Sequence, residues 1–336
     1  MLKKVTSGER KPKPPRRVHV VSHGPHCLDG VAAAVAIARY HSASDVRPYF
    51  SGNPSINEVI RGLEIEDPLD DQELWITDIS WTSAETDAFL RRLAKRGLRI
   101  FWIDHHRTAV ERAKNGAIDV PFAHQIVDER FAASRLVFDY LSERLRTEGR
   151  TNPAFERFAH VVRMADDNDR WLHEVPGSWE LALTLRAMNG PEAYEDLLTI
   201  DERATYTPRM AAARERVAAE MKRSFEIAER SRTTVSLSSG VQVVAAVCDG
   251  YPSEIADRWG RQAANAVFVL FDLKSGAISY RRSPDCTIDL SAVAAAFGGG
   301  GHPAAAGCEI PELLTLLSRA AGERVAEVVN RLGAKS

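Results

Sequence analysis

Segments that read as short strands alternate with helical segments over the first 106 residues of this 336-residue chain. The segments at 18–23, 45–50, 73–80 and 98–106 have strand character, whereas 29–40 is rich in alanine and 83–97 begins with serine and ends with glycine. This rhythm indicates βαβ units, and hence a parallel sheet. Ligands of such sheets gather at the carboxyl ends of the strands.

Three of these predicted strands end on polar side chains that can bind a metal ion or a phosphate. The first ends at His23, the third at Asp78, and the fourth on the Asp-His-His run at 104–106. Cys27 and Asp29 follow the first strand, and Asp29 opens the next helix. Each residue alone has a structural explanation, such as a helix cap or a small buried thiol. Their shared place at strand ends favours a common site.

The residue types at these strand ends point to a pair of divalent metal ions. Histidine and carboxylate ligands together suit a transition metal such as Mn²⁺ better than Ca²⁺ or Mg²⁺, which favour oxygen alone. Two-metal sites, with ions roughly 3.5–4 Å apart, act on phosphate esters, and one carboxylate can bridge the ions. The later stretch MADDNDRW offers further carboxylates at Asp166, Asp167 and Asp169.

Composition sets limits on the partners and the compartment. The formal net charge is -2, so no global positive field favours a long nucleic acid. Four scattered cysteines without a pair motif favour reduced thiols and a cytoplasmic protein. No apolar run approaches the roughly 20 residues that a membrane span requires. Residues 1–17 are polar and basic, without the apolar segment of a signal peptide, and we expect a disordered leader.

The second half of the chain predicts a helical connection and a different domain. Segment 207–231 reads as one long charged helix, and hairpin patterns, a glycine loop at 298–307 and a closing amphipathic helix follow it. We therefore expect an α/β protein with an N-terminal parallel-sheet domain at 18–200, a linker helix at 201–230, and a smaller α+β domain at 231–336.

Five motifs in order resemble the DHH phosphoesterase family, which includes RecJ-type exonucleases and nano-RNases. The Asp-His-His run at 104–106 carries the family's name, and the order His23…Asp29, Asp78, 104–106, Asp167 matches its first four motifs. The stretch SYRRSPDCTIDLSAVAAAFGGGGHPAAAG resembles the DHH-associated C-terminal domain, marked by Gly-Gly-Gly-His followed by Ala-Ala-Gly. The resemblance runs from about Val18 to Leu332.

The resemblance implies a role for each matching residue. His23 would bind the first metal, Asp29 the second, and Asp78 both. His105 and Asp167 would complete the second metal's ligands, with Asp166 and Asp169 as alternatives to Asp167. The two remaining residues would be catalytic without binding metal, since Asp104 would orient the histidines and His106 would face the scissile phosphate.

Cys27 departs from the family pattern, which has aspartate at this position. A thiolate is a softer ligand that favours Zn²⁺ or Fe²⁺ over Mn²⁺, and His26 is an alternative ligand. We interpret Cys27 as a variant metal ligand. The expected cofactor is a pair of Mn²⁺ ions, with Fe²⁺, Zn²⁺, Co²⁺ and Mg²⁺ as alternatives.

The C-terminal glycine loop and nearby basic residues are candidates for substrate contact. Glycines let a backbone approach a phosphate closely, and a guanidinium can bind it in a bidentate manner. Arg282 fits the family's Arg-Ser position, and Ser134 resembles a family serine near the phosphate, whereas Arg281 fits a solvated arginine. The predicted substrate-binding residues are Ser134, Arg282, Gly299, Gly300, Gly301 and His302, of which Arg282 and His302 would also stabilise charge during catalysis.

These residues predict a phosphodiesterase that trims short oligonucleotides or linear dinucleotides to mononucleotides with a metal-activated water. Related alternatives are a 3′-phosphoadenosine 5′-phosphate phosphatase, a cyclic-dinucleotide phosphodiesterase and a single-stranded DNA exonuclease. A nucleotide-binding sensor without catalysis is the alternative of another class, motivated by Cys27. We expect no membrane partner, and the sequence leaves a homodimer open.

Overall fold

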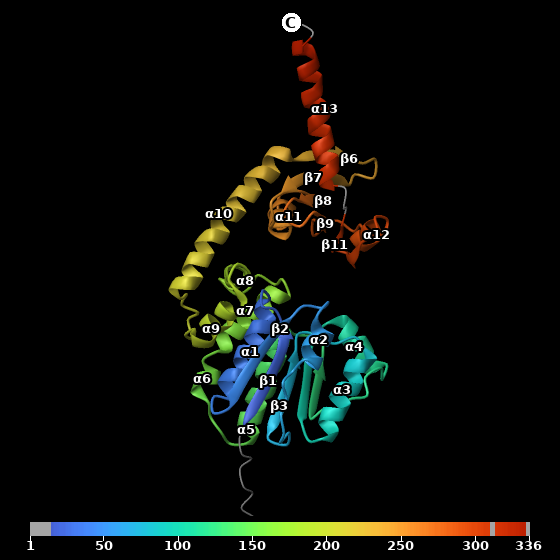
Figure 1. The fold of residues 1–336 in the computed structure, drawn as a ribbon. Coiled ribbons are helices and arrows are strands. Elements are labelled where there is room, and N and C mark those ends of the chain that lie inside the picture. Colours follow the sequence, from blue (N-terminus) through green and yellow to red (C-terminus); the bar gives the residue numbers. More distant parts are fainter. Residues whose placement is uncertain (1–14, 310–312, 334–336) are drawn as a thin grey trace, which may run out of the picture. The chain divides into compact units, whose positions relative to one another are not determined.

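The computed structural model describes residues 15–309 and 313–333, and the chain divides into two compact units, Met1–Val217 and Ala218–Ser336 (Figure 1). The first unit holds a five-stranded sheet and the second a six-stranded sheet. The predicted α/β fold class, with a parallel sheet first, a helical connection and a smaller second domain, is confirmed.

All strands of the first sheet run parallel, in the order β2-β1-β3-β4-β5. The strands are β1 (Arg17–His23), β2 (Asp45–Ser51), β3 (Gln72–Thr77), β4 (Arg99–Asp104) and β5 (His124–Val127). Ser22 pairs with Thr77 on β3, and Thr77 pairs with Ile103 on β4. This register brings the ends of β1, β3 and β4 to the same level, as the sequence predicts.

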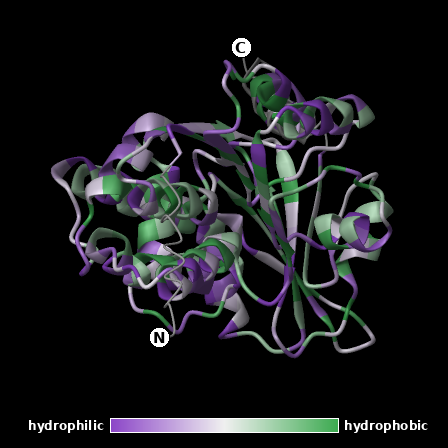
Figure 2. Cartoon of the chain, turned by 90° about the horizontal axis from the view of Figure 1, so that it is seen from below, coloured by the Kyte–Doolittle hydropathy of each residue, from purple (hydrophilic) through white to green (hydrophobic). Residues whose placement is uncertain are grey.

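Helices cover both faces of this sheet, and each face has its own apolar core. Val18, Val20 and Phe101 point to one core, whereas Val21, Ile100 and Trp102 point to the other, as strand alternation requires. The first core is covered by α1 (Leu28–Tyr40), α5 (Ala133–Thr147), α6 (Pro153–Glu156), α7 (Ala159–Asp169), α8 (Ser178–Arg186) and α9 (Gly190–Thr199). The second is covered by α2 (Ile56–Arg61), α3 (Ala84–Lys95) and α4 (Arg107–Lys114). Figure 2 shows hydrophobic residues in the strands and in the helices.

The second unit is built on a mixed sheet in the order β10-β11-β9-β8-β7-β6, in which β7 and β8 pair in parallel and the other pairs are antiparallel. The strands are β6 (Thr233–Ser236), β7 (Gln242–Cys248), β8 (Ala266–Asp272), β9 (Ala277–Arg282), β10 (Gly300–His302) and β11 (Ala305–Glu309). The helices are α11 (Pro252–Gly260), α12 (Leu290–Ala295) and α13 (Leu313–Gly333).

The element bounds refine the expected domain limits. Residues 1–14 of the predicted leader lie outside the described residues, but Arg17 already belongs to β1 and Arg16 pairs with Asp71 at 3.2 Å. The long connecting helix is α10 (Pro208–Ser231), and it begins later than the linker start predicted at residue 201. Among the described residues, no helix has both the length and the apolar character that crossing a membrane requires.

Candidate metal centre

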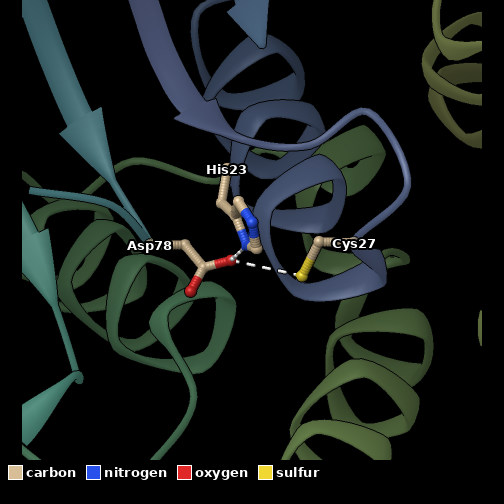
Figure 3. Close-up of side chains that lie close together, drawn as sticks. All are labelled: His23, Cys27 and Asp78. Carbon is tan, nitrogen blue, oxygen red and sulfur yellow. Dashed lines mark hydrogen bonds and ion pairs between the residues drawn. The ribbon is translucent and has the colours of Figure 1, made fainter. Parts of the chain in front are cut away.

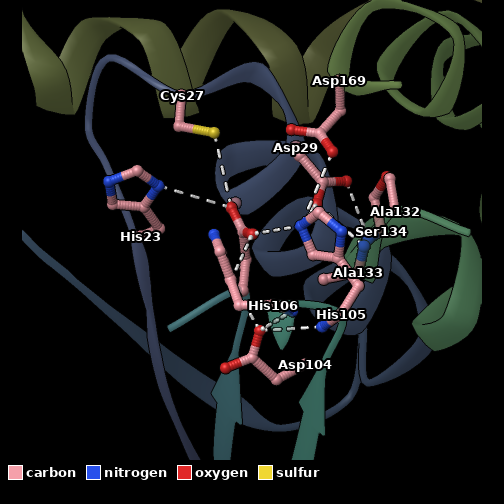
Figure 4. Close-up of polar contacts among 12 residues, drawn as sticks. His23, Cys27, Asp29, Asp104, His105, His106, Ala132, Ala133, Ser134 and Asp169 are labelled. Carbon is pink, nitrogen blue, oxygen red and sulfur yellow. Dashed lines mark hydrogen bonds and ion pairs between the residues drawn. The ribbon is translucent and has the colours of Figure 1, made fainter. Parts of the chain in front are cut away.

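Three neighbouring strands deliver the central side chains of the site (Figure 4). His23 ends β1, Asp78 follows β3 directly, and Asp104 ends β4. Asp78 adopts a φ of 57°, a left-handed conformation that aspartate tolerates better than most residues. Its backbone N–H donates to the Ile103 carbonyl at 3.1 Å, so the turn after β3 is tied to β4. Asp78 is 1% exposed, and its carboxylate lies beside His23, Cys27 and His105.

Helix α1 starts against the end of β1 because Gly30 has no side chain. A Cβ on Gly30 would lie 2.0 Å from the His23 carbonyl oxygen. The Ser22 hydroxyl donates to the Gly30 carbonyl at 2.8 Å, which fastens the helix to the strand. This close approach places Cys27, at the N-cap, and Asp29, in the first turn, next to the strand ends.

His23, Cys27 and Asp78 form the first group of candidate ligands (Figure 3). The His23 Nδ1 lies 3.6 Å from Asp78 Oδ2, and the Cys27 thiol donates to the same oxygen at 3.4 Å. Burial, followed by the charges of Asp78 and Asp29, raises the pKa of Cys27 well above its usual value. A bound cation would counter those charges and favour the thiolate. His26 is exposed and belongs to none of the ligand groups that the described residues form.

Asp29, His105 and Asp169 form the second group. The His105 Nε2 lies 3.8 Å from Asp29 Oδ2 and 3.5 Å from Asp169 Oδ2. The same nitrogen lies 3.2 Å from Asp78 Oδ1. Asp78 therefore turns one oxygen to each group, which is the arrangement that a bridging carboxylate requires.

Asp104 holds both histidines of the Asp-His-His run in position. Its Oδ1 accepts the backbone N–H groups of His105 at 2.7 Å and His106 at 3.1 Å, and it lies 2.7 Å from His106 Nδ1. Ser80 donates to its other oxygen, and the Trp102 indole N–H donates to Ser80 at 3.1 Å. The sequence did not predict this contact of Ser80, because a serine after a strand forms no distinctive pattern. The contacts give Asp104 a positioning role.

Asp167 does not reach the site, and the prediction that it binds a metal is corrected. Its Oδ1 accepts the backbone N–H groups of Glu174 at 2.7 Å and Val175 at 3.0 Å, and Ser178 donates to Oδ2. Positions two apart on a helix differ by about 200°, so Asp167 and Asp169 of α7 point in opposite directions. The structure places the alternative, Asp169, beside His105.

Asp166, the other alternative, supports the start of α5. Its Oδ1 accepts the Ala132 N–H at 2.8 Å, and its Oδ2 lies 3.3 Å from the Arg170 guanidinium. It lies on the same helix face as Asp169, since residues three apart are neighbours on a helix.

Backbone amides at the start of α5 hold Asp29 in place (Figure 4). Ala133 N–H donates to Oδ2 and Ser134 N–H donates to Oδ1, each at 2.8 Å. The first amides of a helix have no partner within it and carry partial positive charge, so a carboxylate suits this position. Ser134 is completely buried, and its backbone N–H holds the Asp29 carboxylate. Its contact with substrate stays a prediction.

The concentrated negative charge of the site shifts several pKa values. Burial and then the neighbouring Asp78 carboxylate raise the pKa of Asp29 well above its usual range, and burial also raises the pKa of Asp169. Burial lowers the pKa of His105, but the hydrogen bond to Asp78 and the nearby carboxylates outweigh it and raise the value to about 9. Buried carboxylates that repel one another are stabilised by a cation, so the donor set fits divalent metal ions.

Of the predicted substrate residues of the second unit, those at 299–302 form the turn after α12 and strand β10, and Arg282 ends β9. A cavity of about 640 Å³ is lined by Arg281 and by residues 298–301, whereas Arg282 and His302 do not line it. Gly301 has a φ of 140°, and a Cβ there would lie 2.6 Å from the Ala306 Cα. The Arg282 guanidinium donates to the Ile288 carbonyl at 2.7 Å, and His302 is exposed on β10.

The sequence suggested that the Arg281 side chain is solvated. In the structure, hydrogen bonds hold it in place. Its guanidinium donates to the Ser253 hydroxyl at 2.9 Å and to the Tyr280 carbonyl at 2.8 Å. Two-residue alternation along β9 separates it from Arg282, and the sequence contains no signal for which of the two faces the glycines.

No family model matches the chain. The chain is 26% identical over 314 residues to the oligoribonuclease NrnB of Bacillus subtilis (strain 168), covering 88% of this chain and 73% of that protein. Among solved structures, the DHH domain of a member of a family of ribosomal proteins matches with a TM-score of 0.59 and 15% identity, covering 91% of this chain and 86% of that one.

Two further solved structures share the fold. The pGpG-specific phosphodiesterase PggH of Vibrio cholerae has a TM-score of 0.55 and 14% identity, covering 93% of this chain and 99% of that one. RecJ of Thermus thermophilus, in complex with Mn²⁺, has a TM-score of 0.53 and 16% identity, covering 93% of this chain and 52% of that one.

The parallel sheet, with its Asp-His-His run at a strand end and the adjoining ligand groups, gives this chain the fold of the solved DHH-domain structure. The resemblance to the DHH phosphoesterase family that was read from the sequence is confirmed.

Gly30→Ala tests the contact that brings α1 to the strand end. The new Cβ must push the helix away from His23, so we expect weaker metal binding and a stability loss of roughly 1–3 kcal/mol, as for overpacked interiors. Isothermal titration with Mn²⁺ and thermal unfolding measure the two effects. Gly52→Ala is the matched control, because its Cβ would meet only Pro54 Cδ at 3.7 Å. Unchanged Mn²⁺ affinity in Gly30→Ala would contradict the role given to this contact.

The affinity for metal should depend on pH through His105. With a pKa of about 9 its ring is protonated at neutral pH and must lose that proton to bind a metal. We expect Mn²⁺ affinity to increase as the pH rises toward that value. At least one proton should be released for every two Mn²⁺ ions bound. Calorimetry in buffers of different ionisation enthalpy measures the release. A flat affinity from neutral to alkaline pH would show that His105 does not titrate in this way.

Proposed function

We propose that the chain is a metal-dependent phosphodiesterase that hydrolyses short oligonucleotides or linear dinucleotides to mononucleotides. The observation that supports this proposal most directly is the shared Asp78 carboxylate. It presents one oxygen to the His23 group and the other to the His105 group. This is the donor arrangement that two-metal hydrolysis of phosphate esters uses.

Each ligand is assigned to one of two ions in this proposal. His23, Cys27 and Asp78 hold the first ion, and Asp29, Asp78, His105 and Asp169 hold the second. We propose Mn²⁺ for both ions, because histidine and carboxylate donors suit it, and the softer Cys27 keeps Fe²⁺, Zn²⁺ and Co²⁺ as alternatives at the first position. Mg²⁺ remains an alternative, and RecJ structures contain either Mn²⁺ or Mg²⁺.

When bound, the two ions would lower the pKa of a coordinated water. They would also place positive charge next to the phosphoryl oxygens. His106 is the residue that faces the phosphate in this proposal. The hydrogen bond with Asp104 raises the pKa of His106, which favours the protonated ring, and a protonated ring can donate from Nε2 to a phosphoryl oxygen. Its side chain is 49% exposed, which leaves it open to a substrate. Asp104 fixes the ring by holding Nδ1, so charge stabilisation requires no reorganisation.

The proposed substrate class follows from the relatives and from the second unit. NrnB is named an oligoribonuclease and PggH a phosphodiesterase specific for pGpG, so both act on short substrates. The glycine turn at 299–301 offers backbone amides to an anion, and Arg281 lines the same cavity. We propose that these groups, with Arg282 and His302 beside them, bind one end of the substrate.

His106→Ala tests the chemistry separately from metal binding. We expect kcat on a linear dinucleotide with Mn²⁺ to fall roughly 10²–10³-fold, as for removal of one charge-stabilising donor, while the metal content stays at two ions per chain. Asp78→Asn should lose both activity and metal. His160→Ala, at a partly exposed position of α7, is the matched histidine control and should retain both.

A substrate panel separates the proposed function from its relatives. Dinucleotides, longer RNA and DNA, cyclic dinucleotides and 3′-phosphoadenosine 5′-phosphate are incubated with the Mn²⁺-loaded chain, and mononucleotide release is measured by chromatography. Fastest turnover of linear dinucleotides supports the proposal. Tight nucleotide binding without turnover of any substrate would instead establish a sensor.

A further inference from the structure

A second cavity lies in the first unit, at the end of the sheet opposite the metal centre. Its volume is about 300 Å³. Its polar lining comes from the end of α1, the start of β4, the end of α5 and the segment after it, and includes Tyr40, His41, Arg99, Arg144, Glu148 and Arg150.

The elements that build the metal centre also build this cavity with their other ends. Helix α1 carries Asp29 in its first turn and ends at Tyr40, and β4 begins at Arg99 and ends at Asp104. A helix of 13 residues spans about 20 Å at 1.5 Å per residue. The cavity is therefore separate from the metal ligands.

Positive charge dominates the cavity. Arg99, Arg144 and Arg150 contribute three guanidinium groups to the lining, against the single carboxylate of Glu148. Arg150 pairs with Glu148 at 2.6 Å, and Arg144 lies 3.7 Å from it. Glu73, beneath the lining, pairs with Arg99 at 2.8 Å. One guanidinium charge remains in excess after both carboxylates are counted.

Several buried polar atoms around the cavity lack a hydrogen-bond partner among the described residues. They include the Arg144 Nη1 and the Arg99 Nε. A buried donor without an acceptor costs roughly 1–3 kcal/mol, and more when it is charged. The Arg99, Arg144 and Arg150 side chains as a whole are 39%, 23% and 40% exposed, so an anion in the cavity can reach other nitrogens of these guanidinium groups.

Helix ends explain only part of this charge. The carboxyl end of a helix attracts cations, which accounts for Arg144 in the last turn of α5. Arg99 comes from a strand and Arg150 from a loop, so neither is explained in this way. The Arg144 and Arg150 guanidinium groups lie 5.4 and 5.8 Å from the centre of the Tyr40 ring, and this stacking holds both in place.

We propose that this cavity is an anion site for a phosphate monoester dianion, such as inorganic phosphate or the phosphate group of a nucleoside monophosphate. Three guanidinium groups line the cavity with one positive charge in excess, and guanidinium groups suit phosphate geometry. The volume lies at the lower end of the range of about 300–1,000 Å³ for small-molecule pockets, which leaves room for the rest of a small ester. The inference rests on the proposed function only for the nucleotide, which that reaction would produce.

Titration calorimetry with inorganic phosphate and with AMP tests the proposal. The Mn²⁺-treated chain is compared with Asp78→Asn, whose metal centre is disabled, so that binding which survives in this variant belongs elsewhere. Arg150→Gln and Arg144→Gln, each introduced into the Asp78→Asn chain, should weaken that binding roughly tenfold or more, as for loss of a charged hydrogen bond. Arg150→Lys should restore part of it.

Arg146→Gln is the matched control, because this arginine lies on the same helix, pairs with Glu143 and does not line the cavity. It should leave the affinity unchanged. Binding of both ligands supports a monoester site, and binding of only one identifies which source fits. The proposal is overturned if neither ligand binds to Asp78→Asn, or if Arg146→Gln weakens binding as much as Arg150→Gln. Dinucleotide turnover is measured separately, so failure of the proposed function remains distinguishable.

Discussion

The buried carboxylate of Asp78 links the two ligand groups on which the centre is built. It is held between β1 and β4 by a left-handed turn and a backbone hydrogen bond to Ile103, so the sheet sets its position. Its two oxygens face different groups, one with His23 and Cys27 and the other with His105. The remaining contacts of the site serve to bring other donors to this carboxylate.

Backbone geometry supplies much of that support. The absence of a side chain at Gly30 lets α1 touch the end of β1, and the first amides of α5 hold both oxygens of Asp29. Asp104 plays the corresponding part for the histidines, since it accepts the backbone N–H groups of both. The ligands are thus positioned by strand ends and helix starts, where the backbone is held by the hydrogen bonds of the fold itself.

The sequence predicted the elements whose position follows from a short local pattern. Strand ends at His23, Asp78 and Asp104 share one edge because parallel strands must align there. The choice between Asp167 and Asp169 depended on which side of α7 faces the site. Four acidic and amide residues follow one another there, so the sequence does not indicate which of them lies on that side. The amides that bind Asp29 lie 104 and 105 residues away in the chain, and no local pattern reports such a contact.

The cavity with three arginines was not foreseen for a related reason. Tyr40, Arg99 and Arg150 come from three separate segments, and each alone resembles an ordinary surface or core residue. Sequence patterns report which residues face a core, whereas this cavity depends on where one helix and one strand stop.

Asp167 shows how a residue can influence the centre without touching it. Its carboxylate accepts hydrogen bonds from the N–H groups of Glu174 and Val175 and from the hydroxyl of Ser178. These bonds hold the segment that follows α7 against the end of that helix. Removing this brace would free the end of α7 and displace its neighbour from His105. A genetic survey that scored survival alone would rank both aspartates together, although only Asp169 lies beside His105.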